Sequence, residues 1–245
     1  MSSTIYPIVI EQEVLRHAYL IISDQYRILI DPGAEFHLNT LVEKLSPYTQ
    51  VEHLDFLILQ SSDLLNITSI NRIVDLGFKG KLIVNQIGTP YLNHMVHAEI
   101  LTLEDIEFEL ELSEKEKLEF IPTPFLPFPD CFATYHTGLK ALFSGHLFSQ
   151  SKLEEAKTEA LIQSINQFHE STLPSVEFVR QNIKKINKYD IETIYPRLGY
   201  QIQKNKPHII DAVIKYDFYN TNQAVLKKND KNVAYNYESI CNHML

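Results

Sequence analysis

The loop after the apolar run at residues 56–59 is where this sequence would be expected to carry chemistry. Hydrolase-like folds place clusters of His, Asp and Glu in such loops, because these side chains bind metals and transfer protons. Residues 60–67 read Gln-Ser-Ser-Asp-Leu-Leu-Asn-Ile, in which Asp63 is the one titratable side chain. The sequence therefore indicates that the expected cluster is missing.

Composition restricts the remaining classes of function. The chain has 245 residues, 44% of them apolar, which is enough for one large core. A net charge of −9 argues against binding to nucleic acid, which requires a basic surface. No apolar run reaches membrane-spanning length, and the N-terminus lacks the features of a signal peptide. Two cysteines, Cys131 and Cys241, suit free thiols in a reducing cytoplasm, where we expect the protein to be located.

The elements that must position the loop alternate between strands and helices. Such alternation predicts an α/β fold, in which layers of sheet are covered by helices. Residues 101–120 predict exposed antiparallel strands with a turn at 113–117, and 133–135 and 141–144 predict a hairpin. The other predicted strands are 5–10, 18–23, 27–30, 54–59, 81–85 and 191–195, and the predicted helices are 40–45, 69–76, 90–97, 152–171 and 174–189.

The domain is expected to occupy residues 1–217. Residues 220–232 are rich in Asn and Lys, which is typical of a linker, and residues 235–245 have helical spacing without a C-terminal cap. We interpret 218–245 as a linker and the start of a helix. The chain would then be a domain cut from a longer protein, although a natural terminus is an alternative.

Six short motifs occur along the chain in a fixed order. They are AYLI at 18–21, ILIDPG at 28–33, the loop from Gln60, TPFLPFPD at 123–130, ALFSGHLF at 141–148 and IYPRLG at 194–199. Together they resemble the metallo-β-lactamase domain of flavodiiron proteins and of the related oxygen-binding diiron proteins. The resemblance covers about residues 5–217 and implies an αββα sandwich of the metallo-β-lactamase type.

The resemblance also implies where metal ligands would lie. The family's first loop reads His-x-Glu-x-Asp-His, a third His lies in the segment matching 125–130, a bridging Asp follows the Leu-Phe-Ser strand, and a last His precedes a Gly. Among the side chains at these positions, only His146 could bind a metal, and a shift by one residue would add Asp63. The positions are occupied by Gln60, Ser62, Leu64, Leu65, Pro127, His146 and Leu198.

The lost ligands lead to expectations about what replaced them. We expect Leu64, Leu65 and Leu198 to be buried together and to close the vacated cleft. Phe125 and Phe128, with Arg197, are candidates to line a pocket beside it.

Two aspartates are predicted to serve the backbone of loops. In Asp31-Pro32-Gly33, the aspartate would accept backbone hydrogen bonds and the glycine would allow positive φ. Asp130 would fasten its own loop in a similar way.

The function indicated is that of a non-catalytic, metal-free flavodiiron-like domain. It would act in sensing, protein interaction or dimerisation, as the input domain of a larger signalling protein. The resemblance implies a homodimer, with a protein partner or fused signalling domain, and no flavin or other cofactor is expected. The alternative is a diiron oxygen-binding protein or oxidoreductase with a relocated, incomplete site formed by Asp63, Asp130, His136 and His146.

Overall fold

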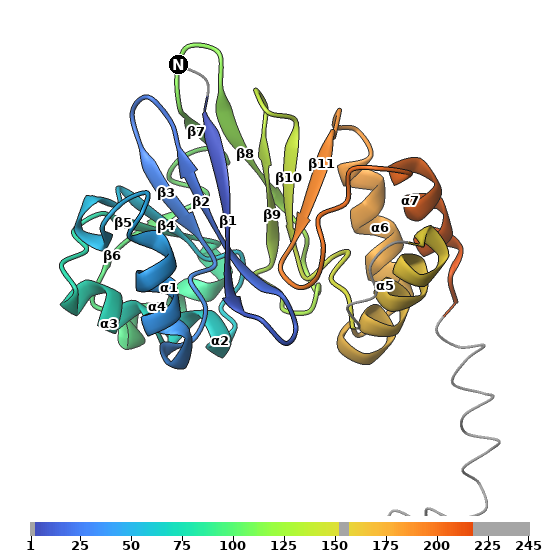
Figure 1. Cartoon of the computed structure of the whole chain (residues 1–245), viewed down its shortest axis with the longest axis horizontal. Coiled ribbons are helices and arrows are strands. Elements are labelled where there is room, and N and C mark those ends of the chain that lie inside the picture. The colour runs from blue at the N-terminus through green and yellow to red at the C-terminus, as the bar shows by residue number, and fades with distance from the viewer. Residues whose placement is uncertain (1–2, 152–156, 218–245) are drawn as a thin grey trace, which may run out of the picture.

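The computed structural model describes residues 3–151 and 157–217. Two sheets face each other, and helices cover the outer face of each (Figure 1). In the described part of the chain, the first sheet comprises β1 (Thr4–Glu11), β2 (Arg16–Ile22), β3 (Arg27–Ile30), β4 (Phe56–Ile58), β5 (Lys81–Val84) and β6 (Glu99–Thr102), in that order. The second has the order β11 (Thr193–Pro196), β10 (Ala141–Gly145), β9 (Phe132–His136), β8 (Lys117–Pro122) and β7 (Glu109–Glu111).

The helices fall into two groups by position along the chain. Those of the first half lie outside the first sheet, and those of the second half lie outside the second (Figure 1). The first group is α1 (Leu38–Leu45), α2 (Leu64–Ile67), α3 (Ile70–Asp75) and α4 (Thr89–Met95), with 3-10 turns at Glu35–His37, Val51–His53 and Gln86–Gly88. The second group is α5 (Thr158–Thr172), α6 (Val176–Ile186) and α7 (Lys206–Lys215). Among the described residues, no helix combines the length and apolarity that crossing a bilayer would require.

Strand pairing changes direction within each sheet. β1 to β3 pair antiparallel, whereas β3 to β6 are parallel and joined through helical crossovers. β7 to β10 are antiparallel, and β11 returns through α5 and α6 to lie parallel to β10. The predicted α/β sandwich with the αββα arrangement is thereby confirmed.

Burial follows the four layers. One apolar cluster lies between the first sheet and its helices, one lies between the two sheets, and one lies between the second sheet and α5 to α7. β3 is buried from Ile28 to Ile30, because it is covered on both faces, which agrees with its continuous apolar sequence. This packing fixes the strand ends from which the functional residues extend.

Most predicted elements correspond to observed ones. Exceptions are α2 and α7, which the sequence reading did not identify, and β6, which joins the first sheet parallel to β5 instead of forming an antiparallel ribbon with β7 and β8. The start of the predicted helix at 152–171 and the whole of 218–245 lie outside the described residues. The domain boundary at 217 therefore stays a prediction.

Several loops meet at the carboxyl ends of β3, β4, β10 and β11. The Asp31 backbone N–H donates to Ile58 O at 2.9 Å, which ties the end of β3 to β4. The Phe132 backbone N–H donates to Gln60 O at 3.0 Å, which joins the two sheets. The Arg197 N–H donates to Gly145 O at 2.9 Å, and Gly145 has a φ of +59°, which turns the chain sharply after β10. Asp31, Gln60, His146 and Arg197 therefore come from the ends of four strands to one edge of the sandwich.

Candidate functional site

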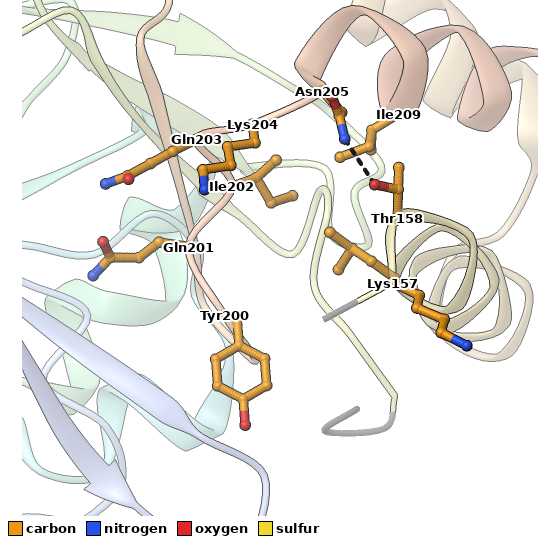
Figure 2. A pocket seen from close by; sticks show the side chains of 10 residues that line it. Lys157, Thr158, Tyr200, Gln201, Ile202, Gln203, Lys204, Asn205 and Ile209 are labelled. Atoms are coloured by element: carbon orange, nitrogen blue, oxygen red, sulfur yellow. Dashed lines mark hydrogen bonds between the residues drawn. The ribbon is translucent and has the colours of Figure 1, made fainter. Parts of the chain in front are cut away.

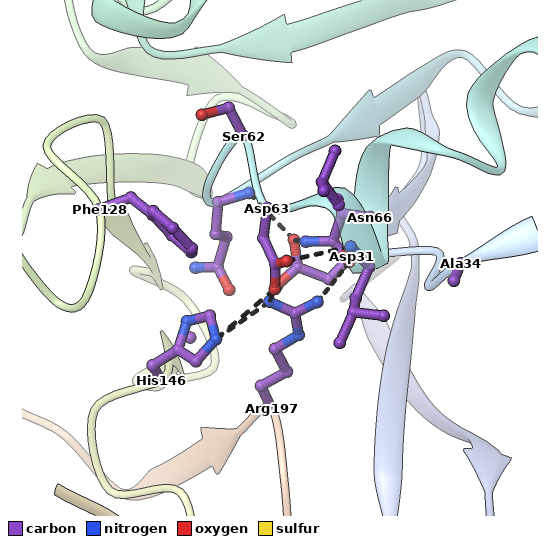
Figure 3. Close-up of polar contacts among 12 residues, drawn as sticks. Asp31, Ala34, Ser62, Asp63, Asn66, Phe128, His146 and Arg197 are labelled. Carbon is purple, nitrogen blue, oxygen red and sulfur yellow. Dashed lines mark hydrogen bonds and ion pairs between the residues drawn. The ribbon is translucent and has the colours of Figure 1, made fainter. Parts of the chain in front are cut away.

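The guanidinium of Arg197 lies at the centre of this edge (Figure 3). One of its nitrogens, Nη1, donates to Asp63 Oδ2 at 2.8 Å and to His146 Nε2 at 3.2 Å. The other, Nη2, donates to Asn66 Oδ1 at 2.9 Å. Arg197 is only 2% exposed, so these polar contacts replace the water that burial removes from its charge.

The side chain of Asp63 is held in place by a second interaction, with the backbone of α2. It is the N-cap of α2, and its Oδ1 accepts the backbone N–H of Leu65 at 3.0 Å. Its other oxygen, Oδ2, is thereby directed at Arg197. A single carboxylate therefore both starts the short helix and forms the buried ion pair.

Asp31 forms a second carboxylate layer behind this pair. Its Oδ1 accepts the Gln60 backbone N–H at 3.0 Å and Asn66 Nδ2–H at 2.9 Å. Burial raises the pKa of Asp31, while the nearby Arg197 charge and the Gln60 hydrogen bond act in the opposite direction. The prediction that Asp31 accepts backbone hydrogen bonds is confirmed, as is the positive φ of Gly33, at +85°.

His146 is neutral in this environment. Burial moves its pKa well below the ordinary range, and the charges of Arg197 and Arg16 lower that pKa further. Its Nε2 accepts a hydrogen bond from Arg197, which places the imidazole proton on Nδ1. The 3.8 Å separation of His146 Nε2 from Asp63 Oδ2 is therefore a contact between a neutral ring and a carboxylate, not an ion pair.

Gln60 and Asp130 hold the loop that follows β4. Gln60 Nε2 donates to Phe143 O at 2.8 Å and to Thr134 Oγ1 at 3.3 Å, so its amide is used between the sheets. Asp130 Oδ2 accepts the Ser62 backbone N–H at 2.6 Å. Asp130 was predicted to fasten its own loop, whereas the hydrogen bond that it accepts comes from the Gln60 loop.

The expectation that three leucines close the cleft is wrong. Leu64 is 62% exposed, Leu65 is 36% exposed and Leu198 is half-buried. The cause is the phase of α2: each residue turns the helix by about 100°, so Asn66 and Ile67 face inward and the two leucines face solvent. Polar groups, not leucines, fill the space behind them.

The three candidate pocket residues do not share one pocket. Phe128 lies against His146 with ring centroids 6.4 Å apart, and Arg197 contacts the same imidazole. Phe125 instead packs on Phe178 of α6, with centroids 4.6 Å apart. Both phenylalanines remain exposed, and of the two it is Phe128 that lies beside His146 and Arg197.

The alternative set of four site residues is only partly brought together. Asp63 and His146 meet at Arg197, and Asp130 bonds the neighbouring Ser62. His136 lies at the far end of β9, six residues from Asp130, or about 20 Å along an extended strand. It is fully buried there and its Nδ1 accepts the Leu139 N–H. No site that combines His136 with the other three is assembled.

The residues present do not fit a two-metal centre. The side chains at the seven implied positions are a glutamine, a serine, three leucines, a proline and a histidine, whereas two irons need several N and O donors converging on one point. Within residues 3–151 and 157–217, no group of three or more His, Cys, Asp or Glu is arranged to hold a metal ion. The two donors that remain, on Asp63 and His146, already contact Arg197.

A separate hollow of about 340 Å³ lies between the first turns of α5 and α7 (Figure 2). The segment 200–205 forms one wall, and Asn205 Nδ2 donates to Thr158 Oγ1 across it at 2.8 Å. Its lining residues include no carboxylate, imidazole or thiol. None of the residues around Arg197 lines it, so it is distinct from the candidate site.

Sequence reasoning missed the centre itself. It named Arg197 only as a pocket residue and gave Asn66 no role, although both follow strands whose carboxyl ends meet at one edge. A buried arginine has no short motif. The signal available was the coincidence of Asp31, Asp63 and Arg197 at strand ends, which together provide two negative charges and one positive charge.

Comparison with known sequences gives one family and one curated relative. Residues 14–199 match the sequence model of a family described as ODP family beta lactamase. A protein of Methanocaldococcus jannaschii, itself named only as uncharacterized, is 24% identical over 215 residues, which cover 84% of this chain and 53% of that protein. The chain thus spans about half the length of the curated relative it matches.

Solved structures with the same fold include a chemotaxis sensor and a flavodiiron protein. The peroxy diiron species of a chemotaxis sensor ODP superposes with a TM-score of 0.75 at 17% identity, covering 90% of this chain and 95% of that one. The flavodiiron protein of Giardia intestinalis superposes with a TM-score of 0.74 at 15% identity, covering 85% of this chain and 56% of that one. At these identities the likeness establishes the fold.

Proposed function

The chain belongs to the ODP family of β-lactamase-like proteins, and from this premise we propose that it is a metal-free, non-catalytic member. Its role is that of a sensory, interaction or dimerisation module, the input domain of a larger signalling protein. It is homologous to the core domains of oxygen-binding diiron and flavodiiron proteins, and the proposed difference is that it holds no metal.

One observation supports the metal-free part of the proposal most strongly. The carboxylate of Asp63 and the imidazole of His146, which would be the remaining metal donors, both contact the guanidinium of Arg197. A metal ion would have to displace a buried cation from its ion pair, with Coulomb repulsion opposing its approach. The site can therefore hold its loops together without any bound group.

The signalling part of the proposal is supported by domain size. The chain covers 95% of the solved chain of the chemotaxis sensor ODP, so a domain of this extent occurs in a sensor protein. It covers only about half of the M. jannaschii relative, which leaves room there for a second region. A module that passes on a structural signal needs a stable fold and an interaction surface, and it does not need a reaction centre.

Dimerisation is the form of interaction we propose first. Beside the Arg197 centre, which comprises Arg197, Asp63, Asn66, His146 and Asp31, the exposed apolar side chains include those of Leu64 in α2 and Phe128 against His146. Such side chains are the type that protein interfaces cover. The homodimer is testable by light scattering across a concentration series.

Metal analysis tests the proposal directly. The protein is purified without chelator and analysed for iron, zinc and manganese, and its near-ultraviolet and visible spectrum is recorded under air and under argon. We expect less than about 0.1 metal ion per chain, no oxygen-dependent absorbance, and identical thermal unfolding with and without a strong chelator. Stoichiometric metal, or a chelator-induced fall of several degrees, would contradict the proposal and favour the diiron oxygen-binding alternative.

A further inference from the structure

We propose that Arg197 is the built-in cation of this domain, holding in place the three segments that a metal would otherwise connect. The inference rests on the proposed metal-free state and explains how the site is held together. Arg197 itself follows β11, Asp63 and Asn66 belong to α2 and its N-cap, and His146 follows β10. One guanidinium therefore joins parts of the chain that are separated by at least 51 residues.

The ligands of the guanidinium are of the types that metals use. A carboxylate oxygen, an imidazole nitrogen and an amide oxygen surround it at 2.8, 3.2 and 2.9 Å. Arginine keeps its charge at every accessible pH, and its planar fork lets two nitrogens serve different partners. The positive charge balances a site that otherwise contains the buried carboxylate of Asp31 and the carboxylate of Asp63, whose side chain is 13% exposed.

The contacts continue from the guanidinium to the loop after β3. Asn66 accepts from Arg197 through Oδ1 and donates to Asp31 Oδ1 through Nδ2. Asp31 in turn accepts the Gln60 N–H, so the chain of bonds ends on the backbone of the Gln60 loop. Loss of the guanidinium would leave a buried carboxylate, an amide oxygen and an imidazole nitrogen without their shared donor, a costly arrangement.

This arrangement makes a specific prediction about Arg197→Ala. The variant keeps Asp63, His146 and Asn66 and removes the cation between them, so a divalent ion gains both the space and the donors. We expect the melting temperature to fall by about 10 °C. Added Zn²⁺ should then restore about 5 °C once its concentration is roughly 100 times its dissociation constant.

Control variants separate this effect from general metal binding. Wild type and Arg72→Ala should not respond to Zn²⁺, because Arg72 forms its ion pair with Asp75 on the exposed surface of α3. Arg197→Lys keeps a positive charge and should lose less stability than Arg197→Ala, also without a Zn²⁺ response. Arg197→Ala combined with Asp63→Asn should lose the Zn²⁺ response. An equal response in wild type and Arg197→Ala, or no response in Arg197→Ala, would overturn the proposal.

The proposal stays testable if Arg197→Ala fails to fold. Asp63→Asn added to it removes the carboxylate left unpaired, so the double variant should fold and melt higher than the single one. A double variant that is no more stable than Arg197→Ala would overturn the proposal that Arg197 is a built-in cation. Metal found in purified wild type would instead contradict the proposed metal-free state. The coupling between Arg197 and Asp63 is measured by a double-mutant cycle of unfolding, and metal content is measured on the purified wild type. A failure of the built-in cation is therefore distinguishable from a failure of the proposed metal-free state.

Discussion

Asn66 and Leu65 are adjacent in sequence, yet they belong to two regions that have opposite characters. The Arg197 centre is a buried polar network in which Asn66 is fully enclosed. We call the second region the rim; it consists of Leu64 and Leu65 at the start of α2, and both side chains are exposed to solvent. The difference agrees with the proposal that the guanidinium of Arg197 is a built-in cation, because polar side chains and not Leu64 and Leu65 fill the space.

The contrast between the Arg197 centre and the rim also explains why the fold tolerates the side chains found at these positions. Carboxylates such as Asp31 and Asp63 are costly to bury alone and acceptable beside a guanidinium. Leucines at the rim cost little, because scattered apolar side chains are normal on protein surfaces. Substitutions in the Arg197 centre should therefore lower the free energy of unfolding strongly, and substitutions at the rim should hardly change it.

The strongest test of this contrast is Asp31→Ala. The substitution removes the acceptor for two buried donors, the Gln60 N–H and the Asn66 amide, and one of the charges facing Arg197. We expect it to lower the free energy of unfolding by about 3–5 kcal/mol, measured by urea denaturation. Asp31→Asn retains an acceptor and should cost less. A loss below about 1 kcal/mol for Asp31→Ala would show that the centre is not the stabilising region.

Acid should lower the free energy of unfolding through buried histidines near the Arg197 centre, whereas the rim leucines do not titrate. His169 is fully buried in α5, where its Nε2 accepts the Phe148 N–H, and burial lowers its pKa to about 3. The unfolded chain, with a histidine pKa near 6.5, binds the proton that the folded chain excludes, so stability falls as pH drops below about 6.5. His169 alone should remove about 2 kcal/mol between pH 7 and pH 5.

Other titrating groups modify the size of this acid effect. Burial also lowers the pKa values of His17, His136 and His146, which adds to the loss, whereas the raised pKa of Asp31 acts in the opposite sense. His169→Gln should therefore reduce the fall in stability between pH 7 and pH 5, measured by urea unfolding at each pH. An unchanged pH profile would contradict the assignment.

The fold could be predicted because its signals are local and repeated. β3 is apolar from Ile28 to Ile30, α3 is followed by Gly77 with φ +101°, and the hairpin of β9 and β10 has a short turn. The residue patterns of α2 and α7 are weaker. α2 has four residues, too short for a periodic pattern, and α7 begins after Asn205, which adopts left-handed geometry that sequence spacing does not reveal.

The site was predicted only in part. The absence of metal-binding side chains can be seen in the sequence, whereas the position of a buried charge such as Arg197 cannot. The missing histidines can be counted along the sequence, whereas the contact of Arg197 with Asp63 spans 134 residues and depends on how two sheets pack. The direction of a side chain on a short helix is equally hidden. Leu65 could be assigned to the correct loop, but its exposure depends on Asp63 capping α2.

Gln60 offers a test of intermediate size at the boundary of the centre. Its amide donates to the Phe143 carbonyl and to Thr134 in the gap between the sheets, and the residue is buried. Gln60→Ala leaves these acceptors without their donor, and we expect a loss of about 1–3 kcal/mol by urea denaturation. Gln25→Ala, in an exposed turn, is the control and should change stability by less than about 0.5 kcal/mol. Equal effects would mean that the inter-sheet bonds contribute nothing measurable.

The smallest effect is expected at the rim, from Leu65→Ala. A leucine that filled the vacated cleft would cost about 2–5 kcal/mol on truncation, whereas Leu65 is 36% exposed and should cost less than about 1 kcal/mol. Leu57→Ala is the matched control and should show the full loss, because Leu57 is fully buried in strand β4. If Leu65→Ala matched Leu57→Ala in urea denaturation, the rim would be packed in solution and the contrast with the Arg197 centre would fail. If Leu65→Ala also weakened self-association measured by light scattering, the exposed leucine would belong to the interface that a dimerisation module requires.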